Sequence, residues 1–492
     1  MTITLTGRDL TRGEVVRVAR AAEPVELAAS ARERMARTRA VVVEQIASGA
    51  AVYGTTTAVG VLKRIAVPAA DAAGYSSWML GHHLVGQGPE APSDVVRATI
   101  LRLANHLAEG SPGVRSAVAE RLIAALNAGE TPIVHVTGSV GSADLAPLAE
   151  LVTPLVEELA LEAGEGTALL DNNAFATAWA TLAVADAAGL LDALDVAGAL
   201  SLDGFAANPS MVHRAIGVVR PYPGIVATLA RLTALLEGSS IHEPGGARNL
   251  QDPLTFRNLP QLQGAARDAL AHVDEVLAIE LNANQGNPIV VADEARVVSV
   301  ADFEILPLAA ALDYLRIVLA TALTAATERI VKALYPPWSA LPAGLAPDAG
   351  TAHPGLTYLS LAAQSLAVEA RLLAAPVSFE LVTTSHAEGI EDRTTMAPLA
   401  ASRLAAMVAI GGSIVAIELA VAAQALELRG HRPGRGTGRA LAAVRRRVPF
   451  LTMEDHVADV GGLADAVRSG EIAREVLDAD AVEHGAGDVD GA

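Results

Sequence analysis

The chain carries several side chains that could perform acid/base chemistry, although none stands in a motif that proves this role by itself. Tyr53 lies in a loop bounded by glycines, and a phenol with an ordinary pKa of ~10 becomes a base only when its surroundings change that pKa. Asp171 and Glu391 could form a carboxylate pair for acid/base catalysis, or could equally be helix-cap acids. The two-pronged guanidinium of Arg257 suits a carboxylate ligand, whereas most arginines simply lie at the surface.

Several other catalytic classes are excluded by what the sequence lacks. It contains no cysteine, which excludes disulfides, thiolate metal sites and cysteine nucleophiles. It has no P-loop, no HExxH motif and no GxSxG motif. His82 and His83 are adjacent and cannot share one helix face, and no nearby residues complete a ligand set. We therefore expect no metal.

The hydrophobic pattern indicates long helices that must position these residues. Aromatic residues make up 3% of the chain, so Ala, Leu and Val must fill the core, and such side chains let helices pack closely. Strands and helices do not alternate, which argues against a parallel sheet. The sequence predicts a mainly α fold, a long-helix bundle, with a short strand at Ile3–Thr6. The longest expected helices are Leu262–Ala283, Leu306–Leu334 and Ala397–Leu428, and the longest expected loops are Glu243–Arg257, Tyr335–Pro354 and Phe379–Thr395.

Charge and hydropathy bear on partners and location. The net charge of −19 argues against nucleic-acid binding, and the arginines between Arg429 and Arg447 lie in a Gly/Pro-rich stretch that indicates a solvated loop. Leu404–Leu426 is apolar enough for a membrane span, but it contains Glu418, and a helix apolar on all sides can form the centre of a soluble bundle. The N-terminus lacks a signal-peptide pattern. We expect a cytoplasmic protein that binds neither nucleic acid nor membrane.

One segment, Gly138–Leu148 (GSVGSADLAPL), resembles the signature G-S-V-G-A-S-G-D-L-A-P-L of the histidine and phenylalanine ammonia-lyases. The resemblance runs with few gaps from about residue 25 to about residue 430. In that family an Ala-Ser-Gly triad cyclises to methylidene-imidazolone, an electrophilic prosthetic group. The resemblance implies a long-helix bundle of the histidine ammonia-lyase and fumarase-like type, and a homotetramer in which each active site combines loops from several subunits.

Further segments match the family's functional residues. Tyr53 in YGTTTAVG matches the loop whose tyrosine is the catalytic base, and Glu391 in IEDRTTMAP matches the glutamate of Q-E-D-H-V-S-M-A-P. His83 in GHHLVGQG matches the histidine of S-H-A-x-G, although it could equally be a structural, hydrogen-bonded histidine. In LQDPLTFRNLPQ, Gln251 matches a pocket-lining glutamine and Arg257 matches the arginine that holds the substrate carboxylate.

The resemblance also suggests how the chain is organised. Phe303 matches a ring that packs beside the prosthetic group, although a core ring is the simplest interpretation, and Asn287 with Pro288 matches an S-D-N-P segment. We expect an N-terminal domain at residues 1–200 with the tyrosine loop and the triad region, and a central bundle and oligomer core at 201–430. C-terminal helices should follow at 431–478, and an acidic, disordered tail at 479–492.

The departures from the family concern the prosthetic group. One residue is missing, which leaves Gly141, Ser142 and Ala143 as the conceivable triad. A third-position glycine relaxes the steric limits on the cyclising turn, whereas Ala143 adds a Cβ. Asp171 replaces the family's catalytic Asn, and Leu254 replaces a Tyr. We expect that the prosthetic group does not form and that no other cofactor is used; the alternative is a methylidene-imidazolone made from Gly141–Ala143.

Three functions remain open at this point. The first is an enzyme without the prosthetic group that performs elimination, addition or cyclisation on a carboxylate-bearing, amino-acid-like molecule, with Tyr53, Ser142, Asp171 and Glu391 as catalytic candidates. The second is a methylidene-imidazolone-dependent ammonia-lyase or aminomutase. The third is a non-catalytic homologue that binds ligands or partners. Ser142 could also be only part of a turn before a helix that starts at Leu145, with Asp144 as its N-cap.

Overall fold

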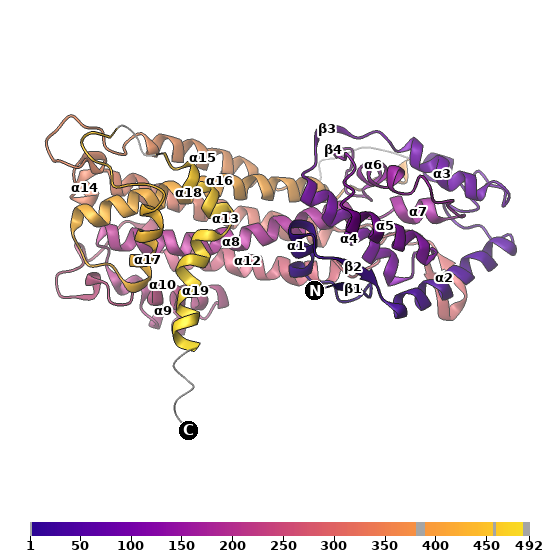
Figure 1. The fold of residues 1–492 in the computed structure, drawn as a ribbon, viewed down its shortest axis with the longest axis horizontal. Coiled ribbons are helices and arrows are strands. Elements are labelled where there is room, and N and C mark those ends of the chain that lie inside the picture. The colour runs from indigo at the N-terminus through magenta and orange to yellow at the C-terminus, as the bar shows by residue number, and fades with distance from the viewer. Residues whose placement is uncertain (1, 380–388, 456–458, 486–492) are drawn as a thin grey trace, which may run out of the picture. The chain divides into compact units, whose positions relative to one another are not determined.

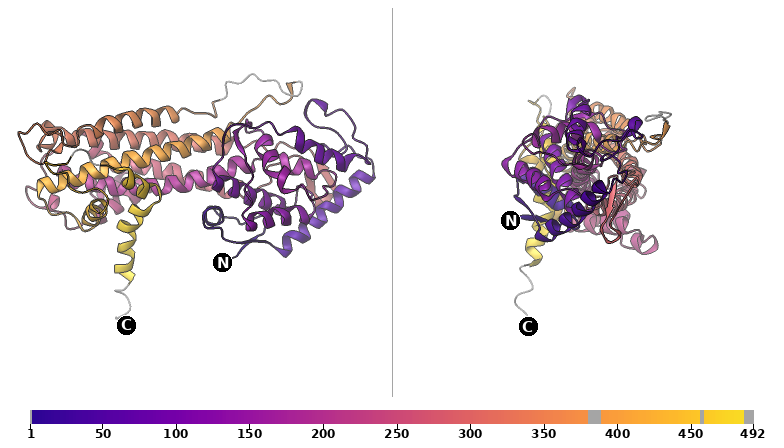
Figure 2. Two further views of the ribbon diagram at one scale, coloured as in Figure 1. Left: turned by 45° about the horizontal axis from the view of Figure 1, so that its top comes forward. Right: turned by 90° about the vertical axis from the view of Figure 1, so that its right-hand side faces the viewer.

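Helices dominate the computed structural model, which describes residues 2–379, 389–455 and 459–485 (Figures 1 and 2). The mainly α fold predicted from the sequence is confirmed. In the described residues the named strands form three two-stranded pairs. The chain divides into two compact units. Unit 1 comprises Met1–Ala185, Val273–Asp313 and Pro376–Ser402, and unit 2 comprises Asp186–His272, Tyr314–Ala375 and Arg403–Ala492.

Each unit therefore gathers segments that are far apart along the chain. The domains predicted from the sequence, with boundaries at residues 200, 430 and 478, describe consecutive segments rather than these interleaved units, and they stay a prediction. Four long helices contribute residues to both units. They are α8 (Ala174–Phe205), α12 (Leu259–Glu280), α13 (Leu306–Leu334) and α16 (Ala397–Arg429).

Unit 1 begins with the short strand that was predicted near the N-terminus. β1 (Ile3–Leu5) pairs in parallel with β2 (Val25–Leu27). Between them, α1 (Arg12–Ala21) starts with a capping box, in which the side chains of Thr11 and Glu14 each accept from the other's backbone N–H. The other two pairs are antiparallel: β3 (Gln87–Glu90) with β4 (His135–Thr137), and β5 (Ile289–Val291) with β6 (Arg296–Val298).

The helices of unit 1 bury small and branched apolar side chains. Most residues of α4 (Ser93–Glu109) from Val95 onward are buried, and α5 (Ser116–Ala128) packs against it. This close packing is what a core poor in aromatic residues requires. The remaining helices of unit 1 are α2 (Ala29–Ala47), α3 (Ala72–His82), α6 (Leu145–Leu155) and α7 (Glu165–Leu170).

Three helical stretches are long and apolar enough to cross a membrane by length and composition alone: Glu165–Phe205, Leu306–Leu334 and Ala397–Arg429. In these stretches, 78%, 61% and 72% of the most apolar window lies buried inside the structure. Within α16, Ile414–Leu426 is buried throughout. This burial agrees with the interpretation of Leu404–Leu426 as a core helix.

The core of unit 2 encloses an ion pair, which explains why the apolar helix α16 can contain the acid Glu418. The side chains of Glu418 on α16 and Arg329 on α13 are 1% and 2% exposed, and Arg329 Nε lies 2.6 Å from Glu418 Oε1. Arg329 Nη2 donates to Glu418 Oε2 at 3.1 Å, and the Ser201 hydroxyl on α8 donates to Oε1 at 2.8 Å. Both carboxylate oxygens are satisfied, which is the condition for tolerating a buried ion pair.

The C-terminal helices pair the basic cluster with acids. Arg445, Arg446 and Arg447 form ion pairs with glutamates, Arg446 and Arg447 sharing Glu475. A disordered tail was predicted from residue 479, but helix α19 (Glu471–Gly485) continues past residue 478. Residues 486–492 of that tail lie outside the described residues. So do residues 380–388 of the predicted loop Phe379–Thr395. The other helices of unit 2 are α9 (Ala215–Val219), α10 (Pro223–Leu235), α11 (Leu254–Arg257), α14 (Pro336–Ser339), α15 (Leu359–Leu373), α17 (Arg435–Arg445) and α18 (Gly461–Arg468).

Candidate active site

Tyr53 lies in the loop between α2 and α3, which is fastened to α7. Thr167 Oγ1 donates to the carbonyl of Gly54 at 2.7 Å, and a Cβ at Gly54 would lie 2.2 Å from the same Thr167 oxygen. Gly54 also has a φ of +64°, so a side chain at this position would be strained as well as crowded. The phenol oxygen of Tyr53 accepts from the N–H of Gly60 at 3.0 Å. The loop thus holds the Tyr53 hydroxyl at a defined position.

Asp171 follows the last residue of α7 and lies close to Tyr53. Burial raises the pKa of the Asp171 carboxyl to about 7, against the opposing effect of a hydrogen bond from Asn287, and the charge of Glu391 raises it further. Burial likewise raises the pKa of Tyr53 to about 12; the Gly60 hydrogen bond opposes this, and the charges of Asp171 and Glu391 add to it. A Cβ at Gly60 would lie 3.7 Å from Glu391 Oε1. The structure therefore brings Tyr53, Asp171 and Glu391 into one site of unit 1.

The signature loop is held to the segment that follows Glu391. The carbonyl of Gly141 accepts from Thr395 Oγ1 at 2.8 Å and from Asn173 Nδ2 at 3.2 Å. The hydroxyl of Ser142 donates to the carbonyl of Arg393 at 2.7 Å. Gly141 has a φ of +82°, and a Cβ there would lie 2.1 Å from Thr395 Oγ1. Glycine is required at this position both by the turn and by the close approach of Thr395.

Asp144 occupies the predicted N-cap position of α6, but its carboxylate does not cap that helix. It accepts from the Ser139 hydroxyl at 2.7 Å and from the N–H of Ala176 at 2.8 Å, so it satisfies the first turn of α8 instead. The side chain is fully buried, and burial raises its pKa to about 6. The start of α6 at Leu145 is confirmed, and the capping role is corrected: the turn places Asp144 between the two helices.

The triad positions fit poorly with the prosthetic group that the family forms there. Ring closure joins the backbone N of the third residue to the carbonyl carbon of the first, a turn for which glycine is suited. The third residue here, Ala143, has a φ of +65° and is 3% exposed, so its Cβ is packed inside a turn that already strains an L-residue. Residues 141–143 therefore do not match the requirements for cyclisation.

The other predicted residues are placed as follows. His83 is the C-cap of α3 and is partly exposed, and its Nδ1 lies 2.8 Å from the carbonyl of Met79, as expected for a structural histidine. Phe303 is partly buried and precedes Glu304, whose backbone pairs with that of Ser142, so the predicted ring lies next in sequence to a neighbour of the signature loop. Gln251 and Arg257 are exposed and belong to unit 2, with Arg257 as the last residue of α11. Their roles in substrate binding stay predictions.

Two residues that position the site had no assigned role in the sequence analysis. Asn173 and Thr395 are completely buried and both donate to the Gly141 carbonyl. They could have been found from the sequence, because each is a polar residue directly beside a matched segment and just before an expected helix. Among the residues that the structure describes, no group of three or more His, Asp or Glu side chains is placed to hold a metal ion.

A mainly helical chain that brings a tyrosine and two carboxylates into one site has the groups for acid/base chemistry. Comparison with known proteins agrees. The model of the aromatic amino acid lyase family matches residues 10–158 and 155–446, and this chain belongs to that family. A histidine ammonia-lyase from Symbiobacterium thermophilum is 35% identical over 496 residues, covering 96% of this chain and 97% of that protein.

Solved structures confirm the fold that the resemblance implied. Ergothionase from Treponema denticola superposes with a TM-score of 0.89 at 26% identity, covering 97% of this chain and 100% of that chain. Tyrosine aminomutase from Streptomyces globisporus also has a TM-score of 0.89 at 26% identity, covering 97% and 99% of the two chains. The chain is thus a lyase-family enzyme with the histidine ammonia-lyase fold.

Proposed function

We propose that this enzyme works without methylidene-imidazolone and performs acid/base elimination, addition or cyclisation on a carboxylate-bearing, amino-acid-like small molecule. The observation that carries the proposal is Asp171, a carboxyl with a pKa of about 7 beside the Tyr53 hydroxyl. A group whose pKa lies near the working pH can both accept and return a proton, which is the requirement for an acid/base catalyst. The family's asparagine, a neutral amide, cannot do this.

The surroundings of Tyr53 indicate which of the two groups, Tyr53 or Asp171, donates the proton and which accepts it. The sequence predicts Tyr53 as the base, but its neighbours in unit 1 are acids, and its pKa moves up to about 12 rather than down. A phenol in this state keeps its proton near neutral pH and can donate it. We therefore propose Asp171 as the proton acceptor and Tyr53 as the proton donor; burial keeps the pKa of Asp171 high, and the charge of Glu391 adds to this.

The remaining parts of the proposal concern binding and assembly. Arg257 would anchor the substrate carboxylate through its two-pronged guanidinium, with Gln251, His83 and Phe303 lining the pocket, and Ser142 would contribute its hydroxyl. We further propose a cytoplasmic homotetramer. A second copy of the chain would cover the apolar face of α15. That face presents Leu361, Val368 and Leu372 at helical spacing, and these residues are 62%, 49% and 71% exposed.

The mass of the intact chain tests the proposal most directly. Cyclisation and dehydration of the triad would remove two waters, so we expect the purified protein to have its full sequence mass and to release no ammonia from histidine, phenylalanine or tyrosine. A mass lower by two waters would reject the proposal in favour of a methylidene-imidazolone-dependent ammonia-lyase or aminomutase. Light scattering tests the tetramer separately, and a monodisperse monomer would contradict it.

A further inference from the structure

A small cavity adjoins Asp171 inside unit 1. Its volume is about 20 Å³, and its lining includes Arg39, His106, Asn284 and Asn287 together with Asp171. A cavity of roughly 10–15 Å³ is large enough to hold one water molecule. Asn287 donates to the Asp171 carboxyl, and both residues line the cavity, so the carboxyl and the cavity are neighbours.

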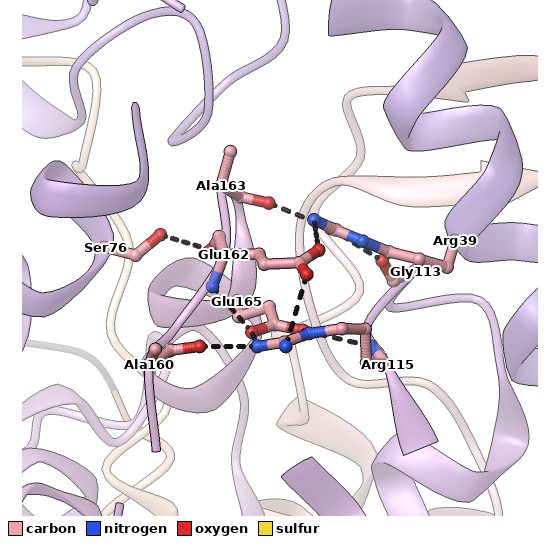
Figure 3. Close-up of polar contacts among 8 residues, drawn as sticks. All are labelled: Arg39, Ser76, Gly113, Arg115, Ala160, Glu162, Ala163 and Glu165. Carbon is pink, nitrogen blue, oxygen red and sulfur yellow. Dashed lines mark hydrogen bonds and ion pairs between the residues drawn. The ribbon is translucent and has the colours of Figure 1, made fainter. Parts of the chain in front are cut away.

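Arg39 contributes a buried donor to this cavity. Its side chain is 10% exposed, and its guanidinium is fixed by three acceptors (Figure 3): Nη1 donates to the carbonyls of Ala163 at 2.9 Å and Gly113 at 3.3 Å, and Nη2 donates to Glu162 at 2.8 Å. Glu162 is held in turn by Arg115, whose Nη1 lies 3.2 Å from it. The Nε–H donor of Arg39 is buried and has no hydrogen-bond partner among the described residues.

Figure 3 also shows why Arg39 cannot easily turn away. Arg115 binds Glu165 through two contacts, Nε to Oε1 at 2.9 Å and Nη2 to Oε2 at 2.6 Å, and Glu165 is fully buried. Two arginines and two glutamates thus form one charged cluster in which Glu162 is shared. Because both ends of the Arg39 guanidinium are occupied, the direction of its Nε–H is set by the cluster.

His106 contributes a buried acceptor to the same cavity. It is 1% exposed, and burial together with the charge of Arg102 lowers its pKa to about 3, so the imidazole is neutral. One ring nitrogen hydrogen-bonds the carbonyl of Ala283, whereas Nδ1 is buried and has no partner among the described residues. A Cβ at Gly286 would lie 2.8 Å from the Asp171 carbonyl oxygen and 3.5 Å from His106 Cε1, which places the ring edge beside Asp171.

We propose that this cavity binds a water molecule that accepts from Arg39 Nε–H, donates to His106 Nδ1 and hydrates the carboxyl of Asp171. An unpaired buried donor and an unpaired buried acceptor on the wall of one water-sized cavity are the pattern that internal water satisfies. The water supplies Asp171 with a polar neighbour in addition to Asn287. Arg39 and His106 are then positioning residues that act on Asp171 through this water.

Burial and the charge of Glu391 disfavour the ionised form of Asp171, and the Asn287 hydrogen bond favours it. Of the two residues that also line the cavity, His106 is near the charge of Arg102, and Arg39 is paired with Glu162. Removing the water would leave the Asp171 carboxylate less solvated and raise its titration midpoint further. The role of this water in catalysis rests on the proposed function, whereas the binding site itself does not.

The test uses the purified full-length enzyme and needs no substrate. A high-resolution crystal structure should contain a water bonded to Arg39 Nε and His106 Nδ1. Infrared difference spectra against Asp171→Asn should give the titration of the Asp171 carboxyl. His106→Leu should raise its midpoint by about one unit, which is a tenfold change in the ratio of the ionised to the neutral form. His106→Asn, which keeps an acceptor near the position of Nδ1, should leave the midpoint close to that of the wild type.

A second variant protects the test against a folding failure of His106→Leu. Arg39→Lys keeps the cation beside Glu162 but removes Nε–H, and it should raise the Asp171 midpoint in the same direction. A cavity without water in the crystal structure, or a midpoint unchanged in both His106→Leu and Arg39→Lys, would overturn the proposal. If the midpoint shifts in a protein whose mass is lower by two waters, the water site stands and the proposed function fails.

Discussion

Two carboxylates, the buried Glu418 in unit 2 and the partly buried Asp171 in unit 1, have opposite surroundings. Glu418 in unit 2 meets the guanidinium of Arg329 and the hydroxyl of Ser201, which together satisfy both of its oxygens. Asp171 in unit 1 receives the neutral amide of Asn287 and faces another acid, Glu391. A carboxylate paired with a guanidinium is fixed in its charged form and serves structure. A carboxyl that is desolvated and faces like charge stays close to its titration point and can serve chemistry.

The largest expected effect is a loss of catalytic activity when Asp171, the carboxyl without a guanidinium partner, is substituted. Asp171→Asn keeps the shape of the side chain and removes the titrating group, so kcat on the native substrate should fall by ~10²–10⁴-fold. Asp302→Asn, which changes an exposed acid of the same unit, is the matched control and should leave kcat within a few-fold of the wild type. Steady-state kinetics of the two variants measure the difference. Retention of full activity by Asp171→Asn would remove Asp171 from the mechanism.

The second-largest expected effect comes from removing the Tyr53 hydroxyl. Tyr53→Phe preserves packing and removes the proposed proton donor, so kcat should fall by ~10²-fold or more with little change in binding. Tyr75 on α3 provides a control, because its hydroxyl binds the same loop: it accepts from the N–H of Val59 at 3.2 Å much as Tyr53 accepts from Gly60. Tyr75→Phe should be nearly silent. Equal losses in both variants would show that the loop needs both hydroxyls for structure rather than for proton transfer.

In unit 2 the same type of substitution should affect stability. Glu418→Gln leaves Arg329 buried opposite a neutral amide, and the free energy of unfolding should fall by about 3–5 kcal/mol. Glu328→Gln removes the exposed partner of Lys332 on the same helix as Arg329 and should cost less than about 1 kcal/mol. Chemical denaturation compares the two. A small effect of Glu418→Gln would mean that the buried pair is replaceable.

The smallest expected effect is a pH dependence of stability. The pKa of Asp171 is raised from 3.8 to about 7, so between these values the folded chain holds a proton that the unfolded chain has lost. Wild-type stability relative to Asp171→Asn should therefore fall as pH rises from about 4 to about 7, and should stay level above that. Melting temperatures of both proteins across this range test the sign. A difference that is constant with pH would show that the folded and unfolded pKa values coincide.

The sequence predicted the membership of the site better than its electrostatics. Tyr53, Asp171 and Glu391 were named from matched segments, and the structure brings them together. The direction of the Tyr53 pKa could not be predicted, because it depends on burial and on charges that only the folded loop brings near. The capping of α8 by Asp144 was missed for a similar reason, since its partner Ala176 is 32 residues away and the local pattern favours the adjacent helix.

Fold prediction succeeded where the pattern was long and periodic, as in the helices α13 and α16. The short strand β1 was also predicted. Arg39 and His106 had no sequence signal, because each is an ordinary residue of a helix and becomes notable only through an unsatisfied buried atom. Gln251 and Arg257 belong to unit 2, and their part in the site stays a prediction.

Unit 1 is built from three separate segments of the chain, and this affects how it folds during translation. Its three segments end at Ala185, Asp313 and Ser402, so the unit cannot be complete until 402 of the 492 residues have been synthesised. Tyr53 is made early and Glu391 late, so the apolar surfaces of unit 1 that the later segments cover stay exposed until those segments are made. Such long-range assembly is slow and exposed to aggregation. The nascent chain should therefore depend on protection by chaperones for most of its translation, and the site should form among the last features of the fold.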